Sequence, residues 1–207
     1  MIITYYGLSS FKIQSKQNGS SQVIINPFSD KTGLKGPKTD AEVLIIGTNE
    51  KYITKKNIIE KPFIIDCAGE YDVEGIGVKG VETKKDEKQN IIYRIAIDGI
   101  TIIHLGHLNK ILSSEELEEL SGTDILLVPV GGNGVLNASK AKEVINQIEP
   151  RIIIPMLYKI PGLIFDFDEI SNFIKEIGLD PTNEEKLKIT KKDLPQEDME
   201  LVILNVK

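Results

Sequence analysis

The pattern of apolar residues changes in kind near residue 108 of this 207-residue chain, and the change limits the folds open to it. Before that point, short runs rich in β-branched and aromatic residues alternate with turn residues, which is typical of β-strands. After it, amphipathic segments alternate with short apolar runs, which is typical of helices between buried strands. Such a chain is expected to pack two sheets face to face and to place its helices outside them.

The first half predicts seven strands and two tight turns. The strands are predicted at residues 4–6, 11–14, 22–26, 43–46, 62–66, 75–81 and 91–97. Asn18-Gly19 and Asp98-Gly99 are the dipeptides that a hairpin with two positive φ angles prefers. The second dipeptide joins residues 93–97 to a further apolar strand at 100–104, so these two strands are expected to pair.

The second half predicts three helices. Ser113 and Glu116 form a capping box before a short helix that runs to Leu120. Asn137 is expected to cap a helix over residues 138–149, and Asp166 a helix that ends at 177 before Gly178. The remaining apolar runs predict strands at 124–130, 152–155, 187–190 and 199–206, and residues 84–90 and 181–185 are expected to be loops.

Composition excludes several classes of function. The net charge is −6 and only two of the 25 basic residues are arginine, so no basic surface for nucleic acid is expected. No apolar run approaches the roughly 20 residues of a membrane span, and the first residues lack a basic signal-peptide region, so the protein is expected in the cytoplasm. The single cysteine, Cys67, is expected to be a buried thiol.

Both histidines lie in one pentapeptide, His104-Leu105-Gly106-His107-Leu108, directly after a predicted strand. Histidine is the commonest metal ligand and also the side chain best suited to acid-base chemistry near neutral pH. A zinc site needs three or four ligands, so two histidines alone are too few. The residues that could complete such a site, or pair with His107 in metal-free acid-base chemistry, are carboxylates and one amide: Glu50, Asp66, Glu70 and Asn49. The glycine-rich turn at 131–134 lacks the Lys-Ser/Thr of a phosphate-binding loop and is interpreted as structural.

Seven segments in order carry a family resemblance. They are YGLSSF (6–11), INPF (25–28), AEVLII (41–46), GEY (69–71), HLGHL (104–108), DILLVPVGG (124–132) and IPMLY (154–158). In sequence and spacing they resemble the metallo-β-lactamase-fold hydrolases, in particular the short bacterial and archaeal branch related to the ascorbate-phosphate lactonase group. The resemblance implies a single domain over residues 1–207 of the α/β (α+β) class. It also implies a four-layer αββα sandwich of two mixed sheets with outer helices.

The resemblance also implies a zinc or manganese centre, but most of its ligand positions hold other residues. The family's Gly-His-Ser is Gly7-Leu8-Ser9 here, and its main histidine motif falls on residues 47–53, which contain no histidine or aspartate. His104 is retained, the bridging aspartate is replaced by His107, and the last histidine is replaced by Leu157. The altered positions expected to line the former cleft are Leu8, Thr48, Glu50, Tyr52, Ile53 and Leu157.

Three functional hypotheses follow. The leading one is a degenerate member, a pseudoenzyme without cofactor or metal-dependent hydrolysis, that binds a small ligand or a protein partner. The second is an active phosphodiesterase, lactonase or esterase with one zinc or manganese ion on His104 and His107, with Glu50 or Glu70 recruited. The third is a structural subunit of a larger assembly. Self-association as a homo-oligomer is implied by the family, whereas the sequence reveals no interface.

Overall fold

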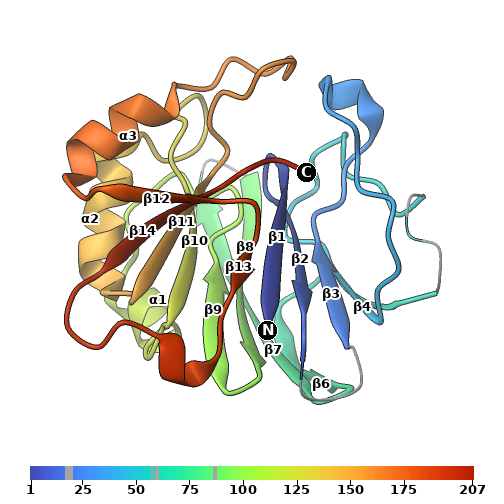
Figure 1. The fold of residues 1–207 in the computed structure, drawn as a ribbon. Coiled ribbons are helices and arrows are strands. Elements are labelled where there is room, and N and C mark those ends of the chain that lie inside the picture. The colour runs from blue at the N-terminus through green and yellow to red at the C-terminus, as the bar shows by residue number, and fades with distance from the viewer. Residues whose placement is uncertain (17–20, 57, 59–60, 86–87) are drawn as a thin grey trace.

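The computed structural model describes residues 1–16, 21–56, 58, 61–85 and 88–207, and it contains the two expected mixed sheets (Figure 1). The smaller sheet has the order β13-β1-β2-β3-β4-β5. Its strands are β1 (Ile2–Gly7), β2 (Ser10–Gln14), β3 (Gln22–Ile25), β4 (Val43–Ile45), β5 (Phe63–Ile65) and β13 (Leu187–Lys188). Strands β1 to β3 are antiparallel and β3 to β5 are parallel. The late strand β13 pairs with the first strand of the chain.

The larger sheet has the order β12-β14-β11-β10-β9-β8-β7-β6. Its strands are β6 (Gly69–Val73), β7 (Ile76–Lys85), β8 (Lys88–Ile97), β9 (Ile100–His104), β10 (Ile125–Pro129), β11 (Ile152–Met156), β12 (Pro181–Glu184) and β14 (Glu200–Leu204). Strands β6 to β9 form antiparallel hairpins, whereas β9, β10, β11, β14 and β12 run parallel. The parallel strands end at the same edge, where the loops of a functional site gather in α/β folds.

The helices lie outside the sandwich. They are α1 (Ser114–Glu119), α2 (Ala138–Ile148) and α3 (Ile170–Ile177), with two 3₁₀ turns, η1 (Asp30–Thr32) and η2 (Lys191–Asp193). Helices α2 and α3 pack on each other and lie on the outer face of the larger sheet (Figure 1). The expected fold class is therefore confirmed. Within the described ranges no helix is long and apolar enough to cross a membrane.

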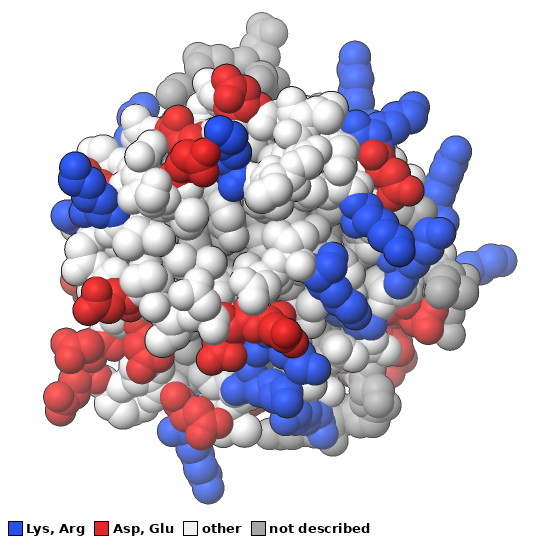
Figure 2. Space-filling view, turned by 45° about the horizontal axis from the view of Figure 1, so that its top comes forward, with Lys and Arg blue, Asp and Glu red and all other residues white. Residues whose placement is uncertain are grey.

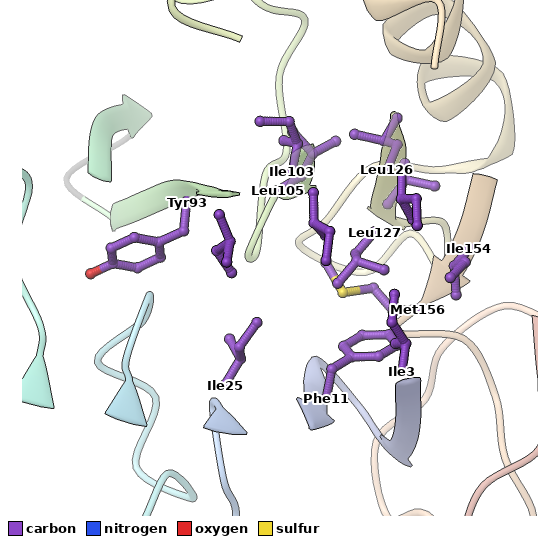
Figure 3. Close-up of a cluster of buried hydrophobic side chains, with 14 of the residues drawn as sticks. Ile3, Phe11, Ile25, Tyr93, Ile103, Leu105, Leu126, Leu127, Ile154 and Met156 are labelled. Atoms are coloured by element: carbon purple, nitrogen blue, oxygen red, sulfur yellow. The ribbon is translucent and has the colours of Figure 1, made fainter. Parts of the chain in front are cut away.

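The core lies between the facing sheets. Ile3, Phe11 and Ile25 come from β1 to β3 of the smaller sheet and are completely buried. Figure 3 shows them opposite side chains of the larger sheet, which include Tyr93, Leu127 and Met156. Because each pair of facing strands contributes apolar side chains on its inner face, the two sheets are held by burial rather than by hydrogen bonds.

Several local predictions are confirmed. The Asp98-Gly99 turn has φ angles of 52° and 74° and joins β8 to β9. Ser113 and Glu116 form the expected capping box, and Asn137 caps α2 through Lys140 N–H. The Asn18-Gly19 turn lies outside the described residues.

Other local predictions are wrong for identifiable reasons. No strand was predicted between residues 66 and 75, but residues 69–73 form β6, because Glu74 and Gly75, with φ of 53° and 75°, form a tight turn that pairs it with β7. Residues 181–184 form β12 at the edge of the sheet, where a proline at the start of a strand is tolerated. The expected loop at 84–90 is largely β-strand, because β7 and β8 pair as far as Lys85 and Lys88.

Two further corrections concern a helix start and the cysteine. Helix α3 begins after Glu169 and not after Asp166, and its first turn has no side-chain cap. The backbone N–H of Asp168 instead donates to Gly131, which keeps the preceding residues in a loop. Cys67 is exposed and not buried, because it follows the short edge strand β5, and its Sγ lies 3.0 Å from the Tyr71 hydroxyl.

Candidate functional site

A cleft of about 690 Å³ lies where loops from both sheets meet. Glu50 and Tyr52 reach it from the loop after β4, His107 from the turn after β9, and Phe165 from the loop between β11 and α3. The end of the sandwich that carries these loops faces the viewer in Figure 2, where Lys and Arg side chains gather along one side. Segments far apart in the sequence thus form one concave surface of the kind that small-molecule sites use.

His107 occupies the centre of a polar cluster in this cleft. Its Nε2 lies 3.2 Å from the Tyr52 hydroxyl and 3.3 Å from Ser9 Oγ, and its Nδ1 lies 4.0 Å from Glu50 Oε1. The side chain is 14% exposed, so the ring is reachable from the cleft but held by protein on most sides. Two hydroxyls face one ring nitrogen and a carboxylate faces the other.

The turn that carries His107 is fixed by Asn90 on β8. Asn90 Oδ1 accepts a hydrogen bond of 2.6 Å from the His107 backbone N–H, and Asn90 Nδ2 donates to the carbonyl of Leu105 at 3.0 Å. Gly106 turns the chain with φ of 62°, and a Cβ at this position would overlap Asn90 Oδ1. The pentapeptide therefore needs both the glycine and the asparagine to present His107.

His104 belongs to the core and does not face the cleft. Its ring is completely buried: Nε2 lies 2.9 Å from the Ser9 carbonyl, and Nδ1 accepts a hydrogen bond from Gly106 N–H at 3.1 Å. Burial lowers the pKa of His104 to about 4, against hydrogen bonding that acts to raise it, so the ring is neutral at pH 7. A metal site shared by His104 and His107 would have to displace one of these hydrogen bonds, and the buried His104 ring does not line the cleft that His107 borders.

Tyr52 links the histidine to the aromatic side of the cleft. Its ring centroid lies 6.3 Å from that of His107 and 5.1 Å from that of Phe165. Burial, and next the charge of Glu50, raise the pKa of Tyr52 well above its usual range. The phenol therefore keeps its proton and can donate it in a hydrogen bond to His107.

Some of the side chains expected to complete a metal site, or to line the former one, border the cleft and others do not. Thr48, Asn49 and Glu50 line the cleft. Glu70 projects from β6 into solvent and pairs with Lys79 at 3.1 Å, and Asp66 pairs with Lys55 at 3.5 Å. Glu70 and Asp66 therefore do not line the cleft: Glu70 lies on the edge strand β6, and Asp66 follows β5 and lines a separate, smaller pocket with Lys55.

The altered ligand positions divide in the same way. Thr48, Glu50 and Tyr52 line the cleft, whereas Leu8 and Leu157 are buried beside it and Ile53 does not border it. Leu8 and Leu157 both have φ of 54°, an uncommon backbone conformation for leucine, and the Leu157 N–H donates to the Leu8 carbonyl at 3.0 Å. These two positions thus share a left-handed backbone conformation and a direct hydrogen bond under apolar side chains.

The donor set does not fit the zinc or manganese centre that the family resemblance implies. Within the described part of the chain, no three His, Cys, Asp or Glu side chains lie together. His107 and Glu50 are the two that converge in the cleft, and a protein zinc site takes at least three. The other nearby donors, the hydroxyls of Tyr52 and Ser9, are neutral and already hydrogen-bonded to His107.

Sequence reasoning missed several residues of the site. Lys31, Lys51 and Phe165 line the cleft, Asn90 fixes its central turn, and Ser9 lies beneath His107. Asn90 directly precedes the apolar run at 91–97 and was predicted to end a loop, and its burial becomes visible only in the folded chain. No sequence pattern marks Lys31 or Phe165 as part of the site, because only the folded chain brings their loops together.

Comparisons with known proteins give consistent results. Residues 2–157 match the model of the β-lactamase superfamily domain. The chain is 29% identical to a proposed Zn-dependent hydrolase of the metallo-β-lactamase superfamily from Thermotoga maritima, with a TM-score of 0.84 over 98% of both chains. It is 25% identical to a UPF0173 metal-dependent hydrolase from Pyrococcus furiosus, over 84% of this chain and 92% of that one. A relative of the same name from Archaeoglobus fulgidus is 24% identical over 87% and 93%.

Proposed function

The chain belongs to the β-lactamase superfamily, and from that membership we propose that it is a hydrolase whose reaction centre is His107. The single observation that carries this proposal is the polar cluster around the His107 ring. It lies in a cleft large enough for a small substrate and holds the one solvent-reachable histidine of the described chain. By the family resemblance, His107 stands at the position of the bridging aspartate, which supports an altered form of the family's own site.

This proposal replaces the sequence-based expectation of a binding protein that has lost hydrolysis. The relatives from Pyrococcus furiosus and Archaeoglobus fulgidus are named as metal-dependent hydrolases, and each covers most of this chain. The structural neighbour from Thermotoga maritima is likewise described as a proposed Zn-dependent hydrolase. The replaced ligands had been interpreted as loss of activity, and the comparisons overturn that interpretation.

The hydrogen bonds around His107 support a role as general base. Asn26 Nδ2 donates to Ser9 Oγ at 3.1 Å, which leaves the Ser9 proton to point toward His107 Nε2. With Tyr52 as a second donor on that side and the Glu50 carboxylate on the other, the favoured tautomer carries its proton on Nδ1. Nε2 is then the acceptor, the form that a general base needs.

A hydrolytic step follows from this arrangement. A water that takes the place of one hydroxyl at Nε2 would give its proton to the ring as its oxygen bonds to the acyl or phosphoryl centre of the substrate. Glu50 would stabilise the protonated ring across the 4.0 Å separation. The ring would then return the proton to the leaving oxygen. Each step uses groups of the chain itself.

Turnover assays with matched variants test the proposal. Purified protein would be given p-nitrophenyl esters, a lactone and bis-p-nitrophenyl phosphate, each with and without added Zn²⁺ or Mn²⁺. We expect turnover of at least one class, and we expect His107→Gln to lower kcat/KM by about 10²-fold or more, as for loss of a general base. Tyr52→Phe should cost roughly tenfold, because one hydrogen bond to the base is lost.

Glu70→Gln is the matched control, because Glu70 is an exposed carboxylate outside the cleft. It should leave turnover unchanged, whereas Glu50→Gln should lower it. Full activity in a folded His107→Gln variant would refute the proposal, as would absence of turnover for all three classes under every metal condition. Activity that appears only with added metal would also refute the general-base step, because that step uses groups of the chain alone.

A further inference from the structure

We propose that the cleft accepts an amphipathic organic anion, with its apolar body on the aromatic side and its acidic group on the lysine side. This inference names the substrate class of the centre proposed above and rests on that proposal for the reaction. The inference rests on two features that border one cleft: an apolar wall, and two ammonium groups that have no ion pair among the described residues.

The apolar wall is formed by Tyr52, Ile164 and Phe165. The rings of Tyr52 and Phe165 are 5.1 Å apart, and Phe167 continues the row at 6.1 Å from Phe165. Ile164 is 67% exposed at this wall, one of three large apolar side chains of the described residues that are left in water. Leu108 adds apolar surface beside His107. An apolar ligand body would remove this surface from water, which is the main source of affinity in such sites.

The wall is held in place by a connection between distant loops. The Ile164 N–H donates to the Thr32 carbonyl at 3.0 Å, which joins the loop before α3 to the 3₁₀ turn η1. Lys31 lies in the same turn η1, next to that contact. One hydrogen bond therefore sets the apolar wall and one of the cations at a fixed relative position.

Three lysines and one glutamate line the cleft, and they differ in whether an ion pair neutralises their charge. Lys110 binds both oxygens of Glu116, at 2.7 and 2.9 Å, so its charge is neutralised. Lys31 and Lys51 are exposed, and neither forms an ion pair among the residues that the structure describes. Glu50 faces His107. Two positive charges, against the one carboxylate of Glu50, thus remain at a cleft of a protein whose net charge is −6.

This combination discriminates between ligands. An anion gains about fivefold in affinity from each ammonium group at contact distance in water, and a neutral molecule of the same shape gains nothing. The apolar wall favours a ligand with a ring or chain over a small inorganic anion. Carboxylates and phosphate esters share the required chemistry, so the acidic group is defined by its charge.

Two fluorescent probes with nearly the same rings test the inference by binding alone. 1-Anilinonaphthalene-8-sulfonate is anionic, whereas N-phenyl-1-naphthylamine is its uncharged counterpart. We expect the wild-type protein to bind the sulfonate more tightly, and added salt to weaken only that binding. The double variant Lys31→Gln/Lys51→Gln should lose about 25-fold in affinity for the sulfonate and none for the amine. Phe165→Ala should weaken both probes.

Controls separate this result from non-specific binding and from the reaction. Lys188→Gln removes an exposed lysine of β13 away from the cleft and should leave both affinities unchanged. Competition by 1-naphthoate and by 1-naphthyl phosphate should displace the sulfonate, and the stronger competitor identifies the acidic group. Equal binding of both probes, or an unchanged sulfonate affinity in the double variant, would overturn the inference. The binding assay needs no turnover, so either of these results would leave the hydrolase proposal standing. Conversely, sulfonate binding as expected but no turnover of any substrate would contradict the hydrolase proposal and not this inference.

Discussion

Lowering the pH from 7 to 5 should destabilise the protein through His104. The ring is buried and uncharged in the folded state, where burial lowers its pKa to about 4. In the unfolded chain a histidine titrates near its ordinary pKa of about 6.5. Between these two values the unfolded chain binds the proton and the folded protein does not, so the free energy of unfolding must fall as the pH falls through this window.

The size of the effect follows from the two pKa values. The full shift from about 6.5 to about 4 corresponds to about 3 kcal/mol, at 1.36 kcal/mol per pH unit. From pH 7 to pH 5 about 2 kcal/mol of this is lost, since the unfolded ring is almost fully protonated at pH 5 and the folded ring is still neutral. That loss is a large fraction of the stability of a typical domain.

Urea denaturation across this pH range, compared with His104→Gln, isolates the contribution. A glutamine amide can still donate to the Ser9 carbonyl, but it cannot titrate. The variant should be less stable at pH 7, because the Gly106 N–H loses its acceptor, and the difference from wild type should shrink by about 2 kcal/mol at pH 5. His107→Gln serves as the control for the other histidine. A wild-type pH dependence that persists unchanged in His104→Gln would refute the reasoning.

Further predictions concern two glycines, Gly106 and Gly99, and the carboxylate of Asp98. Gly106→Ala should destabilise the fold by about 3 kcal/mol in urea titration, because the new methyl group meets Asn90 Oδ1 at a positive φ. Gly99→Ala, also at positive φ but with open space around it, should cost only about 1 kcal/mol, and equal losses would contradict the proposed overlap. Desolvation acts to raise the pKa of Asp98, but hydrogen bonds from Ser15 Oγ and the Lys16 N–H lower it overall. Asp98→Asn should therefore cost about 2 kcal/mol at pH 7 by thermal denaturation. The loss should vanish as the pH falls through the lowered pKa of Asp98, and a pH-independent loss would contradict the assignment.

Much of the fold could be predicted because its signals are local. The Asp98-Gly99 turn, the capping box at Ser113 and the cap at Asn137 each depend on a few neighbouring residues. Strands β6 and β12 were missed because they are edge strands with mostly exposed side chains, so they lack a continuous apolar run. Their pairing partners stabilise them as strands, and pairing is not visible in a single sequence.

The candidate site could be predicted only in part. The segment after β4 and the pentapeptide were placed at the cleft because the family resemblance fixes where its ligands fall. The separate roles of His104 and His107 were not predictable, since the two rings differ in burial although they are three residues apart. The cations and the aromatic wall come from loops that meet only in the folded chain, and their sequence gives no pattern that marks them.

The pairing of β13 with β1 has a consequence for synthesis on the ribosome. Ile2 and Ile3 lie opposite Lys188 and Leu187, and the Lys207 N–H donates to the Tyr5 carbonyl at 3.1 Å. Strand β1 therefore emerges about 180 residues before β13, the strand that covers its outer edge. At roughly 5 to 20 residues per second that interval is about 10 to 40 s. During it β1 is a bare sheet edge, so a stalled or C-terminally truncated chain exposes backbone groups that another nascent chain can pair with.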